Sequence, residues 1–167
     1  ITDAFKPITK WNTKIVDPEI IPEVVRKAFK LAQLERPGAT HIEFPEDIAK
    51  KNVERKPLKI TPTSKSIPHD IDMKKALTLI KESKHPVILV GNGVIRANAV
   101  NELKRFAEKN TIYTANTFMS KGVLPNEHKL SLFTVGMQAK DYVMCYFEKA
   151  DLVITIGYDI VEYAPSF

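Results

Sequence analysis

Short apolar segments alternate with helical patterns in the second half of this 167-residue sequence. Apolar residues at helical spacing predict helices near 73–80, 99–107 and 142–150. The predicted strands between them are apolar almost throughout: Pro86–Val90, Thr111–Ala115 and Leu152–Ile156. Strands of this kind are buried on both faces, and helices between them favour parallel pairing. We therefore predict an α/β fold with a doubly wound parallel sheet.

The first part of the sequence has a different pattern. Apolar residues at helical spacing after Asp17-Pro18 predict a helix that ends at Arg36-Pro37-Gly38, and Thr40–Phe44 fits a short strand. Periodicity then disappears across a lysine- and proline-rich stretch, which is typical of a linker. We expect a helix-strand remnant of another α/β domain at 1–48, a linker at 49–70 and a truncated second domain at 71–167.

Composition excludes several classes of function. A hydrophobic fraction of 44% and a net charge of +5 are typical of a globular protein. The longest apolar runs fall far short of the roughly 20 residues that a membrane helix needs. The lysines come without interleaved aromatic residues, so we expect neither membrane nor nucleic-acid binding. The single cysteine, Cys145, is expected to be a buried thiol in a reducing compartment, and we predict a cytoplasmic protein.

Three loops follow the predicted strands and could bind a ligand. In open parallel sheets, ligands bind beyond the carboxyl ends of the strands. The loops at these ends are Gly91-Asn92-Gly93, Asn116–Gly122 and Gly157-Tyr158-Asp159. The sequence therefore predicts a nucleotide-shaped crevice, without indicating a reaction.

The individual signals in these loops leave alternatives open. Gly91 and Gly93 could let backbone N–H groups approach a phosphate, or could simply form a tight turn. Gly136-Met137 could form a second anion site or a plain loop. Asp159 and Glu162 could form an acid–base pair, but a ribose-binding carboxylate or a surface charge is the favoured interpretation.

Several segments resemble thiamine-diphosphate-dependent enzymes. Residues 5–11, 21–29, 36–38 and 43–47 are similar in order and spacing to the end of the pyrimidine-binding domain of these enzymes. Residues 86–93, 119–125 and 150–157 resemble their central domain. Within the family, Gly157-Tyr158-Asp159 with Glu162-Tyr163 most resembles the catabolic acetolactate synthases.

The resemblance implies an enzyme that condenses two pyruvates, or related 2-keto acids, to acetolactate with loss of carbon dioxide. It implies thiamine diphosphate and magnesium as cofactors, a homo-oligomeric parent protein, and catalytic residues before residue 1 and after residue 167. The chain by itself is then structural, with no catalytic or metal-ligating residue.

The central domain of some relatives binds FAD or an adenine nucleotide. The resemblance places such contacts at Gly91, Gly93, Thr117, Met119, Gly136, Met137, Gly157 and Asp159. Flavin-binding synthases carry an Arg-bearing sequence where Tyr158 and Asp159 stand here, so we expect no flavin. The alternatives are another thiamine-diphosphate enzyme, such as a pyruvate oxidase or 2-keto acid decarboxylase, and a non-catalytic module for nucleotide binding or subunit contact.

Overall fold

The computed structural model describes residues 1–60, 62, 66–136 and 142–162. The chain forms two compact units, Ile1–Ile67 and Pro68–Phe167. The division falls inside the segment that the sequence assigns to a linker.

The second unit contains a four-stranded sheet in which every pair of strands is parallel. The strand order is β5-β4-β3-β6. The strands are β3 (Pro86–Val90), β4 (Tyr113–Asn116), β5 (Ser131–Thr134) and β6 (Leu152–Ile156). This arrangement confirms the predicted α/β fold with a parallel sheet.

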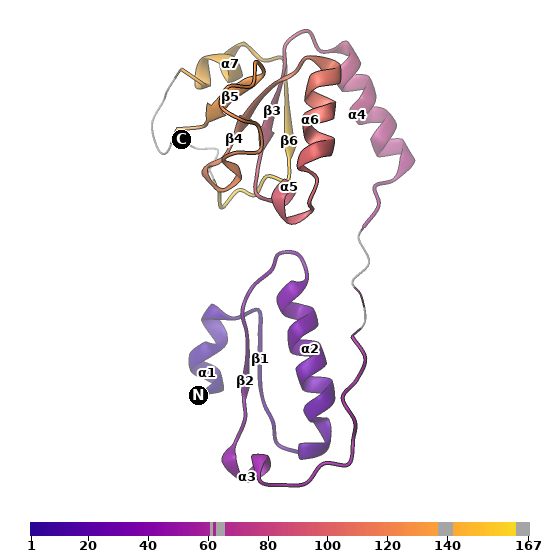
Figure 1. Cartoon of the computed structure of the whole chain (residues 1–167), viewed down its shortest axis with the longest axis vertical. Coiled ribbons are helices and arrows are strands. Elements are labelled where there is room, and N and C mark those ends of the chain that lie inside the picture. Colours follow the sequence, from indigo (N-terminus) through magenta and orange to yellow (C-terminus); the bar gives the residue numbers. More distant parts are fainter. Residues whose placement is uncertain (61, 63–65, 137–141, 163–167) are drawn as a thin grey trace. The chain divides into compact units, whose positions relative to one another are not determined.

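Helices cover both faces of this sheet (Figure 1). They are α4 (Asp70–Glu82), α5 (Gly93–Arg96), α6 (Val100–Asn110) and α7 (Met144–Lys149), with the short η3 (Phe118–Ser120) after β4. Ile88 and Val90 of β3 pack into a core with α6, whereas Val87 and Leu89 pack into a second core with α7. Alternate side chains of a strand point to opposite faces, so an apolar β3 supplies both cores.

Removing the Ile88 side chain tests this arrangement. Ile88 is fully buried, so Ile88→Ala should lower the free energy of unfolding by about 2 to 5 kcal/mol. Urea denaturation measures this change. As a control, Ile71→Ala on α4 removes an exposed side chain and should change stability by about 0.5 kcal/mol or less.

Two strands differ from the sequence prediction. The predicted strand at 111–115 is β4 at Tyr113–Asn116, because Thr111 ends α6 in the left-handed conformation with φ of 54°. The sequence pattern did not reveal β5, because its two apolar residues, Leu132 and Phe133, are adjacent and do not alternate with polar ones. In addition, Phe133 of β5 has φ of 65°, and the β4–β5 register shifts between Thr114 and Asn116.

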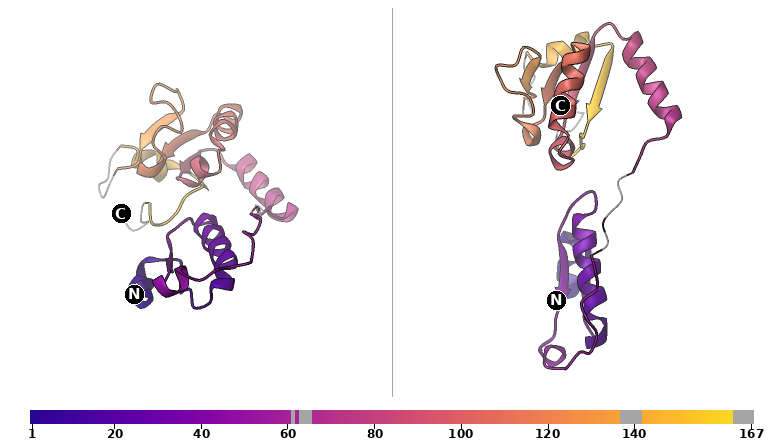
Figure 2. Two further views of the ribbon diagram at one scale, coloured as in Figure 1. Left: turned by 60° about the horizontal axis from the view of Figure 1, so that its bottom comes forward. Right: turned by 45° about the vertical axis from the view of Figure 1, so that its right-hand side comes forward.

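The first unit is built around one parallel pair of strands, β1 (Trp11–Lys14) and β2 (Thr40–Glu43). Its helices are α1 (Thr2–Phe5), α2 (Ile21–Gln33) and α3 (Glu46–Ala49), with the short η1 (Lys6–Ile8) and η2 (Pro18–Ile20). Thr40 donates to the Ala28 carbonyl of α2, whereas the neighbouring His41 stacks on Phe5 of α1. These contacts place α1 and α2 on opposite faces of the pair (Figure 2). Sequence reasoning missed β1, whose residues are mostly polar.

Asp151 joins the starts of β3 and β6 in the second unit. Its carboxylate accepts hydrogen bonds from the Ser83 hydroxyl and from the N–H groups of Lys84 and His85, the latter two at 2.7 and 2.9 Å. The Ser83 hydroxyl and then the Lys84 N–H lower the pKa of Asp151 from 3.8 to about 2. The carboxylate therefore fixes the turn between α4 and β3.

The pKa of Asp151 predicts a pH-dependent contribution to stability. Because the folded-state pKa is lowered, the contribution is present above about pH 4 and is lost as the pH falls toward 2. Asp151→Asn should lower the Tm at pH 6, and the difference from the wild type should shrink between pH 4 and 2. Thermal melts of both proteins across this range measure it, and a constant difference would contradict the assignment.

Candidate functional site

The carboxyl ends of β3, β4 and β6 bring three loops together. β3 pairs with β4 on one side and with β6 on the other. The chain leaves β3 for β4 and reaches β6 only later, so β3 lies at a topological switch point, where open parallel sheets bind ligands. The loops Gly91–Gly93, Thr117–Ser120 and Gly157–Glu162 meet at this edge, which we call the carboxyl edge.

Backbone contacts hold the first and third of these loops against each other. The Gly91 N–H donates to the Ile156 carbonyl at 2.9 Å, and the Gly93 N–H donates to the Gly157 carbonyl at 2.8 Å. A Cβ atom on Gly91 would lie 2.4 Å from the Gly157 oxygen, and one on Gly157 would lie 2.5 Å from the Val94 nitrogen. Gly157 also has φ of 62°. The glycines are therefore required for this close backbone approach.

Gly91→Ala should disrupt this contact. The added methyl group meets backbone atoms, which cannot rotate away, so we expect a loss of about 1 to 3 kcal/mol of stability. The matched control is Asn92→Ala in the same loop, which adds no atom. Chemical denaturation of both variants measures the effect, and equal stabilities would contradict the steric interpretation.

The second loop is held by two buried hydroxyl groups. Thr117 and Ser120 are 1% and 0% exposed. The Ser120 hydroxyl donates to the Val90 carbonyl at 2.6 Å, and the Thr117 N–H donates to the same carbonyl at 2.8 Å. The loop after β4 is thus fastened to the end of β3.

Glu162 connects the three loops. Its two carboxylate oxygens accept the Asn92 N–H at 3.0 and 2.9 Å, and one of them accepts the Thr117 hydroxyl at 2.5 Å. Asp159 positions the turn, because its carbonyl accepts the Glu162 N–H at 2.8 Å. The interpretation of Glu162 as a surface charge is wrong: it is partly buried and bonded to groups 45 and 70 residues away in sequence.

The predicted cofactor-contacting residues are distributed around this edge. Gly91, Gly93 and Gly157 are in mutual backbone contact, Thr117 is buried, and Met119 is 54% exposed. Gly136 follows β5, and Asp159 lies in the turn after β6. Met137 lies outside the described residues. The assignment of these eight residues to cofactor binding stays a prediction.

The prediction for Cys145 is wrong, because its thiol is exposed. Val143, directly before α7, is buried, and Met144 and Phe147 of α7 pack against the core, which leaves Cys145 on the outer side. Among the described residues, no three His, Cys, Asp or Glu side chains are placed to hold a metal ion. Within the same residues, no helix has the length and apolar character needed to cross a bilayer.

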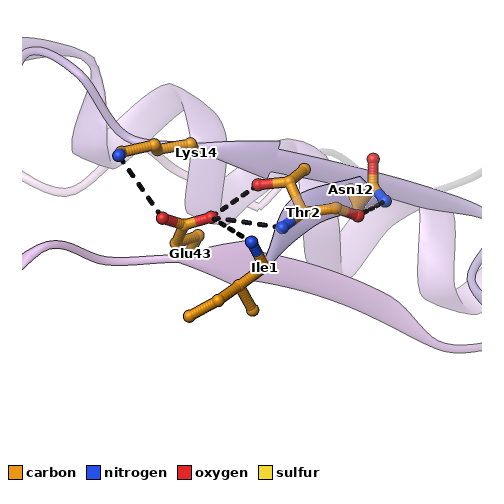
Figure 3. Close-up of polar contacts among 5 residues, drawn as sticks. All are labelled: Ile1, Thr2, Asn12, Lys14 and Glu43. Carbon is orange, nitrogen blue, oxygen red and sulfur yellow. Dashed lines mark hydrogen bonds and ion pairs between the residues drawn. The ribbon is translucent and has the colours of Figure 1, made fainter. Parts of the chain in front are cut away.

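A second polar cluster lies in the first unit (Figure 3). Glu43 accepts the Thr2 hydroxyl at 2.6 Å and lies 3.4 Å from the Lys14 ammonium group. The Thr2 hydroxyl is the main cause of a lowered pKa for Glu43. On the same face, His41 Nδ1 is buried without a hydrogen-bond partner among the described residues. Through its bond to Thr2, the Glu43 carboxylate links α1 to the strand pair.

A groove of about 750 Å³ also belongs to the first unit. It lies between α2 and the extended segment that follows α3, and Arg55 of this segment forms an ion pair with Glu23 of α2 at 2.8 Å. Its walls include Val25, Phe29 and Leu58. None of the predicted cofactor-contacting residues lines it.

Residues 73–166 match the family model of the thiamine pyrophosphate enzyme central domain. The chain belongs to this family. The match covers the four-stranded sheet and the carboxyl edge described above. The assignment of residues 1–48 to the end of a pyrimidine-binding domain lies outside this match and stays a prediction.

Curated relatives of this thiamine pyrophosphate enzyme chain are named as acetolactate synthases. The "Probable acetolactate synthase large subunit" of Methanocaldococcus jannaschii is 40% identical over 92% of this chain and 27% of the relative. The acetolactate synthase large subunit of Corynebacterium glutamicum is 36% identical over 93% of this chain and 27% of the relative. The acetolactate synthase of Bacillus subtilis is 31% identical over 98% of this chain and 29% of the relative.

The resemblance to acetolactate synthases is thus confirmed, while the catabolic type stays a prediction. The chain spans about 27% of the length of the first two relatives. An X-ray structure of a thiamin diphosphate-dependent enzyme from Mycobacterium smegmatis has a TM-score of 0.82 at 24% identity, and covers 98% of this chain and 32% of its own. This similarity shows the shared fold.

Sequence reasoning missed the residues that connect the loops of this thiamine pyrophosphate enzyme domain. Asn92 acts through its backbone N–H, which no residue type reveals. Ser120 is fully buried and bonds to the Val90 carbonyl, although polar residues in a loop are usually expected to be exposed. Glu162 was named from the sequence, together with Asp159, as a possible acid–base pair, a ribose-binding carboxylate or a surface charge, and not as a group that bonds to the other two loops.

Proposed function

We propose that this chain is one part of an enzyme that condenses two pyruvate molecules to acetolactate and releases carbon dioxide. The observation that carries the proposal is the similarity to acetolactate synthases over more than nine tenths of the chain, at 31 to 40% identity. Thiamine diphosphate would supply the carbanion chemistry, and the protein would position the substrates.

In this proposal the chain itself is structural and non-catalytic. The resemblance assigns the residues that hold thiamine diphosphate and magnesium to positions outside this chain, and the described residues contain no group of three His, Cys, Asp or Glu placed to hold a metal ion. We therefore propose that other parts of the protein bind the cofactor, the magnesium ion and the 2-keto acid. The internal bonding of the carboxyl edge supports a scaffolding role, since its polar groups are already paired.

We propose that FAD or an adenine nucleotide, if bound, would contact the carboxyl edge at the eight residues predicted from the resemblance. We also propose that the enzyme does not require such a ligand. The Gly91 and Gly93 N–H groups already donate to Ile156 and Gly157. A phosphate would have to replace these bonds. This supports a flavin-independent enzyme of the catabolic type.

We also propose a cytoplasmic homo-oligomer. Ile71 and Leu79 lie on one side of α4 and are 67 and 55% exposed. Exposed apolar faces of this kind usually pack against other protein surface. A larger assembly would bury them.

Assays of the complete reading frame with pyruvate, thiamine diphosphate and magnesium test the proposed activity. We expect acetolactate and carbon dioxide in a 1:1 ratio, because two pyruvates lose one carboxylate, and no oxygen consumption. Acetaldehyde, peroxide or acetyl phosphate as the main product would instead identify a 2-keto acid decarboxylase or a pyruvate oxidase.

Titration of the 167-residue chain with FAD and ADP tests the alternative of a nucleotide-binding module. A ligand at 100 times its Kd stabilises the folded state by about 2.7 kcal/mol. We expect no such shift in thermal unfolding. A saturable shift would support nucleotide binding in place of a purely structural role.

A further inference from the structure

The Glu162 carboxylate is bonded like a ligand of the carboxyl edge. The carboxylate accepts hydrogen bonds from the Asn92 N–H in the loop after β3 and from the Thr117 hydroxyl in the loop after β4. Glu162 itself belongs to the loop after β6. Its partner Thr117 is 1% exposed. Hydrogen bonds from N–H and O–H groups to a carboxylate are charge-assisted and stronger than bonds between neutral groups.

The other hydrogen-bond donors described near Glu162 bond to backbone carbonyls. The flanking Gly91 and Gly93 N–H groups donate to backbone carbonyls, and Ser120 donates to Val90. The Asn92 N–H and the Thr117 hydroxyl instead share a carboxylate as their acceptor. Without Glu162 both donors would lose this acceptor, and an external anion could take its place.

We propose that Glu162 is an internal anion that closes the carboxyl edge, filling the position that an oxygen of an anionic ligand would take and holding the three loops together without one. The carboxylate is tethered by the turn at Asp159. A tethered group loses little freedom on binding, so an external anion competes with it poorly. Glu162 thereby makes the unit selective against phosphate-bearing ligands.

Chemical rescue of Glu162→Ala tests this proposal in the full 167-residue chain. The variant should lower the Tm by roughly 4 °C or more, since it removes the charged acceptor of the Asn92 N–H and of the Thr117 hydroxyl, which keeps only its contact with the Ser120 hydroxyl at 3.0 Å. Sodium formate, at a concentration that leaves the wild-type Tm unchanged, should restore at least half of the loss, and inorganic phosphate should act similarly. Sodium chloride at equal ionic strength should not.

The matched control is Glu148→Ala, which removes an exposed carboxylate on α7. It should leave the Tm nearly unchanged and show no response to formate. A second readout is the Asn92 amide proton in an NMR spectrum, which should move upfield in Glu162→Ala and return toward its wild-type position with formate.

Glu162→Gln keeps the proposal testable if the alanine variant does not fold. The amide retains the shape and one acceptor but no charge, so it should lower the Tm less than alanine and shift the Asn92 amide resonance. The proposal is overturned if both variants keep the wild-type Tm and Asn92 resonance, or if formate and chloride restore Glu162→Ala equally. These readouts do not involve pyruvate, so a failed acetolactate assay would leave their result unchanged.

Discussion

The pairing of β3 with β4 on one side and β6 on the other determines where the polar groups of the second unit lie. β3 is apolar on both faces and supplies both cores. Because its two neighbours run parallel to it, the ends of all three strands lie at one edge. Loops that are up to 70 residues apart in sequence therefore meet there, and Glu162 can bond to Asn92.

The polar groups of this edge bond mainly to one another, which supports the scaffolding role proposed for the chain. The glycines of the first loop bring two backbones into contact, which uses their N–H groups internally. Thr117 and Ser120 fasten the second loop to the end of β3. The polar groups that could bind a nucleotide thus stabilise the fold. The same edge lies within the part of the chain that matches the thiamine pyrophosphate enzyme central domain.

The strands that were not predicted lack a clear apolar pattern of their own. Helices such as α6, with a clear apolar stripe, and the apolar strands β3 and β6 were predicted within a few residues. The strands β1 and β5 were missed, although β2 and β4 are equally short and were predicted. The conformation of β1 and β5 depends on pairing with β2 and β4, which no local pattern encodes. Cys145 was placed inside for a related reason, since a helix of six residues leaves its buried face undefined.

Apolar periodicity and strand ends are local properties, so they were enough to predict the α/β class, the parallel sheet and the loops that contain the candidate site. Which atoms of these loops meet depends on how the strands pair in the folded protein. Gly91 packs against Gly157 and Asn92 donates to Glu162 only when β3 and β6 are in register. A backbone N–H has the same chemistry in every residue except proline, so its partner is set by the fold and not by the residue type.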